Sequence, residues 1–186
     1  TYSGSGNLSL SFTTTLDVTR APSLGGVTAT ATATGGNATI TGTNATYLLH
    51  ASTADAGSIA GVLSWTGIKN ITDTGVANVN FNTGGSVTGA LVSTTPTGTL
   101  NYGTYATDVT YKLGGTAGST GITGSNTGFT TITGNSANSN TVTGSGATYL
   151  LDAAIADKGS NGGQTWTDFK NITDTGVANV NFNTGG

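Results

Sequence analysis

The chain of 186 residues contains no cysteine and no methionine. The absence of cysteine excludes disulfide bonds, thiol catalysis and thiolate metal sites. The absence of both residues also removes the two most oxidisable side chains, which suits a protein that works outside the cell. No run of 18 apolar residues occurs in the sequence, so we expect no membrane-spanning helix.

Charged side chains are also scarce, at 7% of the chain against about 25% in a typical domain. All of the eight acidic residues are Asp. The net charge is −3 and the isoelectric point is near 4.5. Nucleic acids and anionic membranes attract cationic surfaces, so we expect no nucleic-acid binding and no membrane insertion.

The residues that are abundant favour β-structure. Thr makes up roughly a fifth of the chain, where a few per cent is usual, and there are 31 Gly residues. Strong helix formers are nearly absent, whereas Thr, Val, Ile and Tyr favour pleated strands. Short alternating runs of these residues, bounded by Gly, Asn or Ser, predict an ordered all-β protein.

The sequence repeats itself at long range. Lys69–Gly85 returns without change as Lys170–Gly186, and Trp65 returns as Trp166. The period is therefore about 101 residues, which is typical of an array of stacked units.

This period divides the chain into repeat 1 (residues 1–101) and an incomplete repeat 2 (residues 102–186) of one continuous solenoid. In pattern alone, Leu8–Phe12 aligns with Val109–Leu113.

The fold class that we expect is a parallel β-solenoid, also called a β-helix. Ala77–Asn82 alternates clearly, with Ala77, Val79 and Phe81 facing inward and Asn residues facing outward. Tight antiparallel hairpins are not expected. Equivalent strands share a face only if one period makes a whole number of coils, which predicts about three to five coils of roughly 20–34 residues.

Several motifs resemble a known group of proteins. They are Tyr47–Leu49, Trp65, Lys69–Thr72, Val79–Phe81, Gly84–Gly89, Thr99–Tyr102, Val109–Leu113 and Phe129–Gly134. The pattern resembles the repeat arrays of giant bacterial surface and secreted proteins, namely the filamentous-haemagglutinin-like and "beta strand repeat" adhesins. The resemblance implies a parallel β-helix at the bacterial cell surface, acting as an adhesin, a stalk or an extracellular filament. Many such arrays carry Gly-Gly-x-Gly-x-Asp calcium loops, and the Gly pairs of this chain lack the Asp.

The ends of the chain bear on assembly. The chain begins at Thr1 rather than Met, which predicts a processed chain or a fragment. No distinct cap is visible at either end, and an open solenoid end invites another copy to dock. We therefore expect further copies of the chain as partners, end to end or side by side. The expected assembly ends are Thr1 and Tyr2 at one side and Thr184, Gly185 and Gly186 at the other.

A binding face is the alternative function. In Val27–Thr34, the residues Thr28, Thr30, Thr32 and Thr34 would form a flat row suited to ice or to a carbohydrate. Such a face requires the row to recur in successive coils. The region of repeat 2 that we expect to correspond, Gly121–Thr127, does not keep it.

Catalysis finds little support. His50 is the single His, and its counterpart in repeat 2 is Asp152, which indicates a variable surface position. A polysaccharide-degrading β-helix would need two carboxyl groups about 5–10 Å apart. The repeated acids, Asp55 with Asp157 and Asp73 with Asp174, instead lie beside Gly or Thr in expected turns.

We therefore expect no enzyme and no cofactor. Ca²⁺ remains an alternative, with Asp73 and Asp174 as the weak candidate ligands, because a hard cation needs several oxygen ligands together. Trp65 and Trp166 could stack on sugars, but large indoles more often fill a core.

Overall fold

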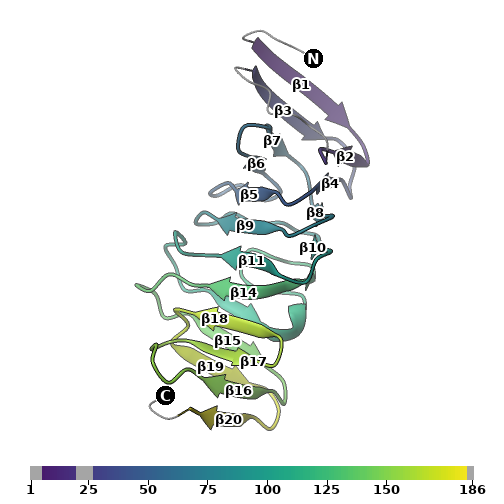
Figure 1. Ribbon diagram of the computed structural model, residues 1–186. Helices are drawn as coiled ribbons and strands as arrows, with labels where there is room; N and C mark the ends of the chain where they lie inside the picture. The colour runs from purple at the N-terminus through teal and green to yellow at the C-terminus, as the bar shows by residue number, and fades with distance from the viewer. Residues whose placement is uncertain (1–5, 20–26, 184–186) are drawn as a thin grey trace.

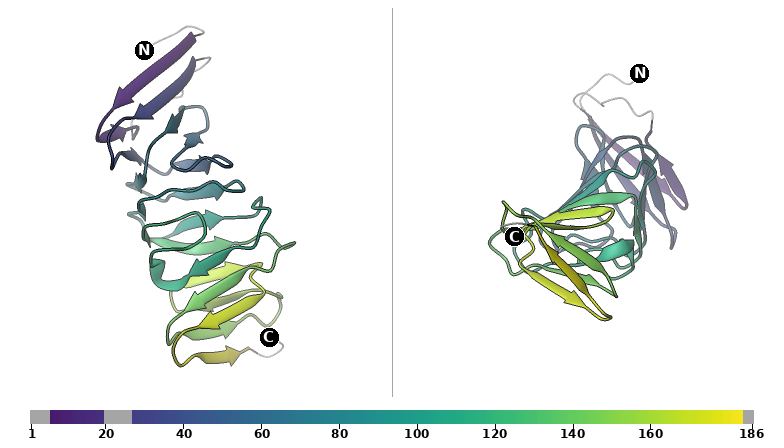
Figure 2. Two further views of the ribbon diagram at one scale, coloured as in Figure 1. Left: turned by 180° about the vertical axis from the view of Figure 1, so that it is seen from behind. Right: turned by 60° about the horizontal axis from the view of Figure 1, so that its bottom comes forward.

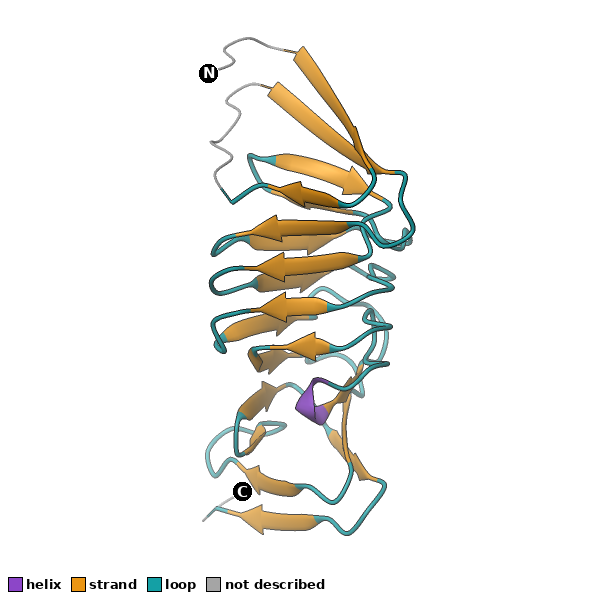
Figure 3. Cartoon of the chain, turned by 90° about the vertical axis from the view of Figure 1, so that its right-hand side faces the viewer, coloured by secondary structure: helices purple, strands orange, loops and turns teal. Residues whose placement is uncertain are grey.

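A computed structural model describes residues 6–19 and 27–183, and nearly every regular element in this part of the chain is a β-strand. The strands stack in rows along one axis, from β1 near the N-terminus to β20 near the C-terminus (Figure 1). Figure 3 shows the chain winding between opposite faces of the stack. The expected all-β, parallel β-solenoid is confirmed.

One face of the solenoid is a sheet of 12 strands. Their order along the axis is β1 (Gly6–Phe12), β3 (Val27–Ala33), β7 (Leu63–Thr66), β6 (Gly57–Ile59), β5 (Thr46–Leu49), β9 (Asn78–Phe81), β11 (Gly98–Asn101), β14 (Phe129–Thr133), β18 (Gln164–Thr167), β17 (Gly159–Asn161), β16 (Thr148–Leu151) and β20 (Asn179–Phe182).

The remaining strands form two smaller sheets. The first contains, in order, β13 (Asn126–Thr127), β10 (Leu91–Ser93), β8 (Asn70–Asp73), β4 (Thr39–Gly42) and β2 (Thr15–Asp17). The second contains β12 (Thr110–Lys112), β15 (Thr141–Gly144) and β19 (Asn171–Asp174). A short 3-10 helix, η1 (Leu113–Gly115), follows β12. Figure 2 shows the same stack of strands from behind and tilted, with the N-terminal strands at one end and the C-terminal strands at the other.

Parallel pairing places like residues above one another. Ile40 of β4 pairs with Ile71 of β8, 31 positions later, and Ile71 pairs with Leu91 of β10, 20 positions later. All three side chains are fully or almost fully buried. Coils of unequal length therefore keep one apolar row in register, because extra residues are accommodated in the loops.

The 12-stranded sheet consists of two sets of six strands in the same order. The pairs of equivalent strands are β1 and β11, β3 and β14, β7 and β18, β6 and β17, β5 and β16, and β9 and β20. Ala31 pairs with Trp65 exactly where Ile132 pairs with Trp166, so Ala31 and Ile132 occupy the same place.

The strand order shows that the expected alignment of Leu8–Phe12 with Val109–Leu113 is wrong. Leu10 of β1 pairs with Ala31, and Leu100 of β11 pairs with Ile132. The counterpart of β1 is thus β11, whereas Val109–Leu113, which we expected to correspond, contributes β12 to a different sheet. The similar alternation of Leu8–Phe12 and Val109–Leu113 reflects strand structure in both and not an equivalent position.

Tight reversals do occur, contrary to expectation. In each repeat three strands, β5–β6–β7 and β16–β17–β18, form an antiparallel meander inside the otherwise parallel sheet. The second meander turns through Gly162 and Gly163, between the paired residues Asn161 and Gln164. Asn-Gly and Gly-Gly are strong signals for a hairpin of this kind, so the sequence carried the signal there.

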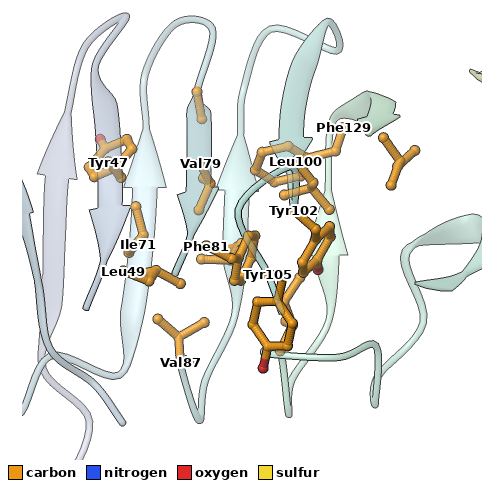
Figure 4. Packing of buried hydrophobic residues seen from close by; sticks show 14 of the residues in the cluster. Tyr47, Leu49, Ile71, Val79, Phe81, Val87, Leu100, Tyr102, Tyr105 and Phe129 are labelled. Carbon is orange, nitrogen blue, oxygen red and sulfur yellow. The ribbon is translucent and has the colours of Figure 1, made fainter. Parts of the chain in front are cut away.

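The core is a narrow column of apolar side chains that runs along the axis. Ala77, Val79 and Phe81 are at most 1% exposed, as the alternation predicted. The Phe81 ring stacks on Tyr102 with centroids 4.3 Å apart, and Tyr105 meets Tyr102 edge-on (Figure 4). Each coil thus covers the apolar residues of the coil before it.

Candidate functional site: the C-terminal end and the outer face

Asp73 is fully buried at the end of β8, and the chain itself saturates its carboxylate. One oxygen accepts hydrogen bonds from the backbone N–H groups of Asn44 (2.7 Å) and Gly75 (2.8 Å). The other accepts from the N–H of Ala45 (2.9 Å) and from the Tyr47 hydroxyl (2.9 Å). These four hydrogen-bond donors offset the cost of burying the charged carboxylate. They also link the turn between β4 and β5 to the next coil.

Asp174 repeats this arrangement near the C-terminus. Its carboxylate accepts from Tyr149 (2.7 Å), Gly176 (2.7 Å), Gly146 (2.6 Å) and Ala147 (3.0 Å). The hydrogen bond from Tyr149, supported by the three backbone N–H groups, holds the pKa of Asp174 well below its usual range. Burial, together with the Asp174 carboxylate, raises the pKa of Tyr149 above its usual value.

Both aspartates therefore bond to turns of their own chain. Asp73 lies in the 5-stranded sheet and Asp174 in the 3-stranded sheet, each with a separate set of donors. Within residues 6–19 and 27–183, no group of three or more His or Asp side chains is placed to hold a metal ion. The arrangement acts as a staple between coils.

Asp55 holds the segment Ser86–Thr88 against the first meander. Its backbone has a left-handed conformation (φ 59°), and its carboxylate accepts from the N–H of Thr88 (2.7 Å) and from the Thr88 hydroxyl (2.8 Å). The Asp55 N–H donates to the carbonyl of Ser86 (2.8 Å). Val87 lies between these two residues and is fully buried. The segment after β9 is thus held from both sides.

In the C-terminal coil, apolar residues are exposed whose counterparts in repeat 1 are buried. Val180 is 43% exposed and Phe182 is 66% exposed, whereas Val79 is 1% exposed and Phe81 is fully buried. The sequences of the two strands, β20 and β9, are identical. The difference arises because β11 covers β9, while β20 pairs within the described chain with β16 alone.

The outer face of the 12-stranded sheet carries two rows of small polar side chains, called the polar ranks below, which run across the strands. Thr30 and Thr32 of β3 are exposed, and their counterparts in repeat 2 are Thr131 and Thr133 of β14. The expectation that Gly121–Thr127 takes the place of the Thr row was wrong, because Ile132 occupies the position of Ala31. The side chain of Thr28 lies outside the described part, and Thr34 follows β3, with its N–H bonded to the carbonyl of Phe12 (2.9 Å).

The polar ranks continue through both repeats. Linked register pairs place Ser64, Asn80, Asn101 and Thr167 on the same outer face as Thr133. The Asn101 amide donates to Asn80 (2.9 Å), so neighbouring coils are joined by a side-chain ladder. The meanders interrupt the ranks with Leu48 and Leu150.

The two Trp residues and His50, which were candidates for sugar stacking and catalysis, contact other side chains of the chain. Trp65 and Trp166 are each 1% exposed and meet Tyr47 and Tyr149 edge-on, so the expectation of core packing is confirmed. The His50 Nε2 lies 3.2 Å from the Ser58 hydroxyl.

The proposed assembly ends, Thr1, Tyr2, Thr184, Gly185 and Gly186, lie outside the described residues. No helix in the described part is long and apolar enough to cross a bilayer.

Comparison with known proteins places no relative beside this chain. No protein-family description, no curated protein and no solved structure matches it. The class that the fold defines is a structural β-solenoid built from a long sequence repeat.

Proposed function

We propose that this chain is a structural β-solenoid of an extracellular bacterial filament or adhesin stalk, which stacks end to end with further copies of itself. The observation that carries the proposal is the contrast between two identical strands. β9 is covered by the next coil, whereas β20 exposes Val180 and Phe182. Burying such side chains contributes roughly 1.5–3 kcal/mol each.

The strand order of the long sheet would continue from β20 of one copy to β1 of the next. β20 is the counterpart of β9, and the neighbour of β9 is β11, whose counterpart is β1. A second copy can therefore place its β1 on β20 as β11 lies on β9. The order of strands then continues across the junction without a break, which is the condition for an open head-to-tail assembly.

The register of the junction follows from β9 and β11. Val79 pairs with Leu100, so Val180 would pair with Leu10 of the next copy. Phe81 stacks on Tyr102, and the residue that corresponds to Tyr102 is Phe12. Leu10 and Phe12 are partly buried in the free chain, which leaves apolar area for the junction.

Assembly would place polar ladders along the whole filament. The outer edge of β20 pairs with no other described strand, and backbone groups on such an edge favour the addition of a parallel strand. The Asn80 to Asn101 contact indicates that Asn181 would meet Ser11 across the junction. The scarcity of charge lets neighbouring coils approach without repulsion.

Sedimentation and electron microscopy test the stacking. We expect the protein to form linear oligomers whose length increases with concentration. Val180→Asp places a charge in the junction and should give monomers, whereas Thr131→Asp places the same charge on the outer face, away from both ends, and should leave oligomers. A wild-type chain that stays monomeric at all concentrations, or a Val180→Asp chain that still forms filaments, would overturn end-to-end stacking.

A second candidate function is supported by the outer polar face. The outer face carries two separate patches of hydroxyl residues, Thr30 and Thr32 beside Ser64 and Thr66, and Thr131 and Thr133 beside Thr165 and Thr167. Within each patch, neighbouring strands are about 4.8 Å apart. A patch of this kind suits ice or a glycan. Thermal hysteresis and a glycan array test it, with Thr131→Tyr as the disrupting variant. Silence of the wild-type protein in both assays would remove this function.

A further inference from the structure

The two repeats are so similar that equivalent strands could exchange places between copies of the chain. Lys69–Gly85 and Lys170–Gly186 are identical, and Tyr47–Leu49 returns as Tyr149–Leu151. β15 pairs with β12 as β4 pairs with β2, so β15 of one copy could instead pair with β2 of another. Such an exchange is domain swapping, to which repeat proteins are prone. The identical segments cannot prevent it, so the choice must depend on residues that differ between the repeats.

A buried polar network forms where repeat 2 begins. The side-chain amide of Gln164 in β18 donates to the Tyr111 hydroxyl (2.6 Å) and to the carbonyl of Phe129 (3.0 Å). Its carbonyl oxygen accepts from the N–H of Gly114 in η1 (2.8 Å). The Tyr111 hydroxyl donates in turn to the Asn126 side chain (3.0 Å). Tyr111 is fully buried and Asn126 is 3% exposed. The network therefore joins β12, η1, β13 and β18.

Leucine occupies the two corresponding places in repeat 1. Leu16 of β2 stands where repeat 2 has Tyr111, because β2 pairs with β4 as β12 pairs with β15. Leu63 of β7 stands where repeat 2 has Gln164, two positions before the Trp of each repeat. Leu63 is 7% exposed, and Leu16 packs against the core. One repeat thus combines two apolar side chains at these places, and the other combines two polar ones.

We propose that these matched pairs, Leu16 with Leu63 and Tyr111 with Gln164, keep each repeat in its own place during folding. If β18 took the place of β7, the Gln164 amide would lie in a buried site beside Leu16, without its bonds to Tyr111 and Gly114. A buried amide that loses its partners is costly. Each exchange therefore creates a mismatch, which is specificity obtained by penalising the wrong partner.

The opposite exchange is penalised as well. With β7 in the place of β18, Leu63 would present only an apolar side chain to the Tyr111 hydroxyl and to the Gly114 N–H. The polar pair is thus needed for the difference between the repeats and not for the coil itself, since repeat 1 builds the same coil with leucine.

This inference does not depend on end-to-end stacking. Stacking would join β20 of one copy to β1 of the next and would leave β15 paired with its own β12. An exchange would place β15 on β2. The two events therefore bring different residues together and can be measured separately.

Disulfide trapping tests the proposal, and the absence of native cysteine makes the result unambiguous. Thr141 pairs with Thr110 in the native sheet, whereas Thr15 lies in another sheet and would take the place of Thr110 after an exchange. Neighbouring strands lie close enough for a disulfide between paired positions. Thr15→Cys with Thr141→Cys therefore reports the exchange, and Thr110→Cys with Thr141→Cys reports the native pairing.

Both reporters are unfolded in urea and refolded at high protein concentration with a glutathione buffer. We expect the native reporter to form its disulfide and the exchange reporter to form little. Replacing the polar pair by the residues of repeat 1, with Tyr111→Leu and Gln164→Leu, should raise the yield of the exchange disulfide at least about fivefold, because the mismatch is removed. Gln164→Leu alone, which keeps the bond between Tyr111 and Asn126, should raise it at least about twofold and serves if the double variant fails to fold.

Val142→Ala separates specificity from stability. It shortens a buried side chain of β15 and leaves every residue of the polar network in place, so it should lower the urea midpoint without raising the yield of the exchange disulfide. An unchanged yield in the leucine variants, or an equal rise with Val142→Ala, would show that the polar pair does not keep the repeats in place.

Discussion

The hydroxyl of Tyr47 donates a 2.9 Å hydrogen bond to the buried carboxylate of Asp73, and Tyr149 repeats this bond to Asp174 at 2.7 Å. In each case the tyrosine lies in the long sheet and the aspartate at the end of a strand on another face. The bond therefore crosses the core and joins two faces of the solenoid. The repeat conserves a staple between coils as well as a pattern of strands.

Asp73→Asn should cost more stability than Asp174→Asn. Each oxygen of Asp73 accepts at least one backbone N–H, so either orientation of an amide places an NH₂ group against a donor. We expect Asp73→Asn to lower the free energy of unfolding by about 2–4 kcal/mol, because the unpaired groups are buried. Asp174 is partly exposed, and water can replace its lost hydrogen bonds, so we expect a clearly smaller loss of stability. Urea unfolding of the two variants measures both; equal costs would show that burial does not set the value of the staple.

Alkaline pH should unfold the solenoid. Burial raises the pKa of Tyr111 to about 12 and lifts those of Tyr47, Tyr102 and Tyr149 above the usual value of 10. The folded chain then holds these protons more tightly than the unfolded chain, so their contribution to stability is complete below pH 10 and is lost as the pH rises above it. We expect late, cooperative tyrosinate absorption that coincides with loss of the β-sheet circular dichroism. Gradual ionisation of all tyrosines near pH 10 in a folded chain would contradict this prediction.

The parallel coils could be predicted from the sequence because the evidence for them is local and repeated. Alternation in Ala77–Asn82 fixes which side chains face the core, and the exact return of Lys69–Gly85 requires equivalent coils. The buried state of Trp65 followed from its size.

The position of each strand along the axis could not be predicted in the same way. β1 and β12 both alternate, yet only pairing partners show that β1 corresponds to β11. The meanders also reverse the order of strands, since β7 lies nearer to β3 than β5 does. Three residues, Ala60–Val62, separate the paired Ile59 and Leu63, and such a longer loop lacks the two-residue signal of Gly162 and Gly163.

The roles of the acidic side chains depend on contacts from distant coils. Asp73 lies beside a turn, as expected, but its bonds to Asn44 and Tyr47 come from the preceding coil. Asp55 and Thr88 are 33 residues apart and meet only because the coils stack. Spacing along the sequence gives no indication of such a pair until the coil lengths are known.

Phe81 and Phe182 form a matched pair for measuring the value of one coil on another. Phe81→Ala empties a closed site against Tyr102 and should lower the free energy of unfolding by about 3–5 kcal/mol. Phe182→Ala, at 66% exposure, should cost the monomer less than about 1 kcal/mol and should increase the monomer fraction in sedimentation. If the two costs were the same, Phe182 would already be covered in the free chain, and the contrast that supports end-to-end stacking would be lost.

Gly57 is required by the packing of the first meander. A Cβ atom at this position would collide with the Trp65 ring and would lie 2.6 Å from the carbonyl oxygen of Leu48. Both neighbours are fixed, since Trp65 is buried and Leu48 belongs to the adjacent strand β5. We therefore expect Gly57→Ala to destabilise the fold by about 1–3 kcal/mol through overpacking.

Gly36 provides the control for this substitution. A Cβ atom there would meet nothing within 4 Å, and Gly36 is exposed. Gly36→Ala should therefore leave stability unchanged or raise it by about 0.4–1 kcal/mol, because alanine restricts the unfolded chain. Thermal unfolding of the two variants side by side separates the collision from the general effect of replacing glycine. A Gly57→Ala chain as stable as Gly36→Ala would mean that Trp65 can move, and that the meander is not held by the close approach of β6 to that ring.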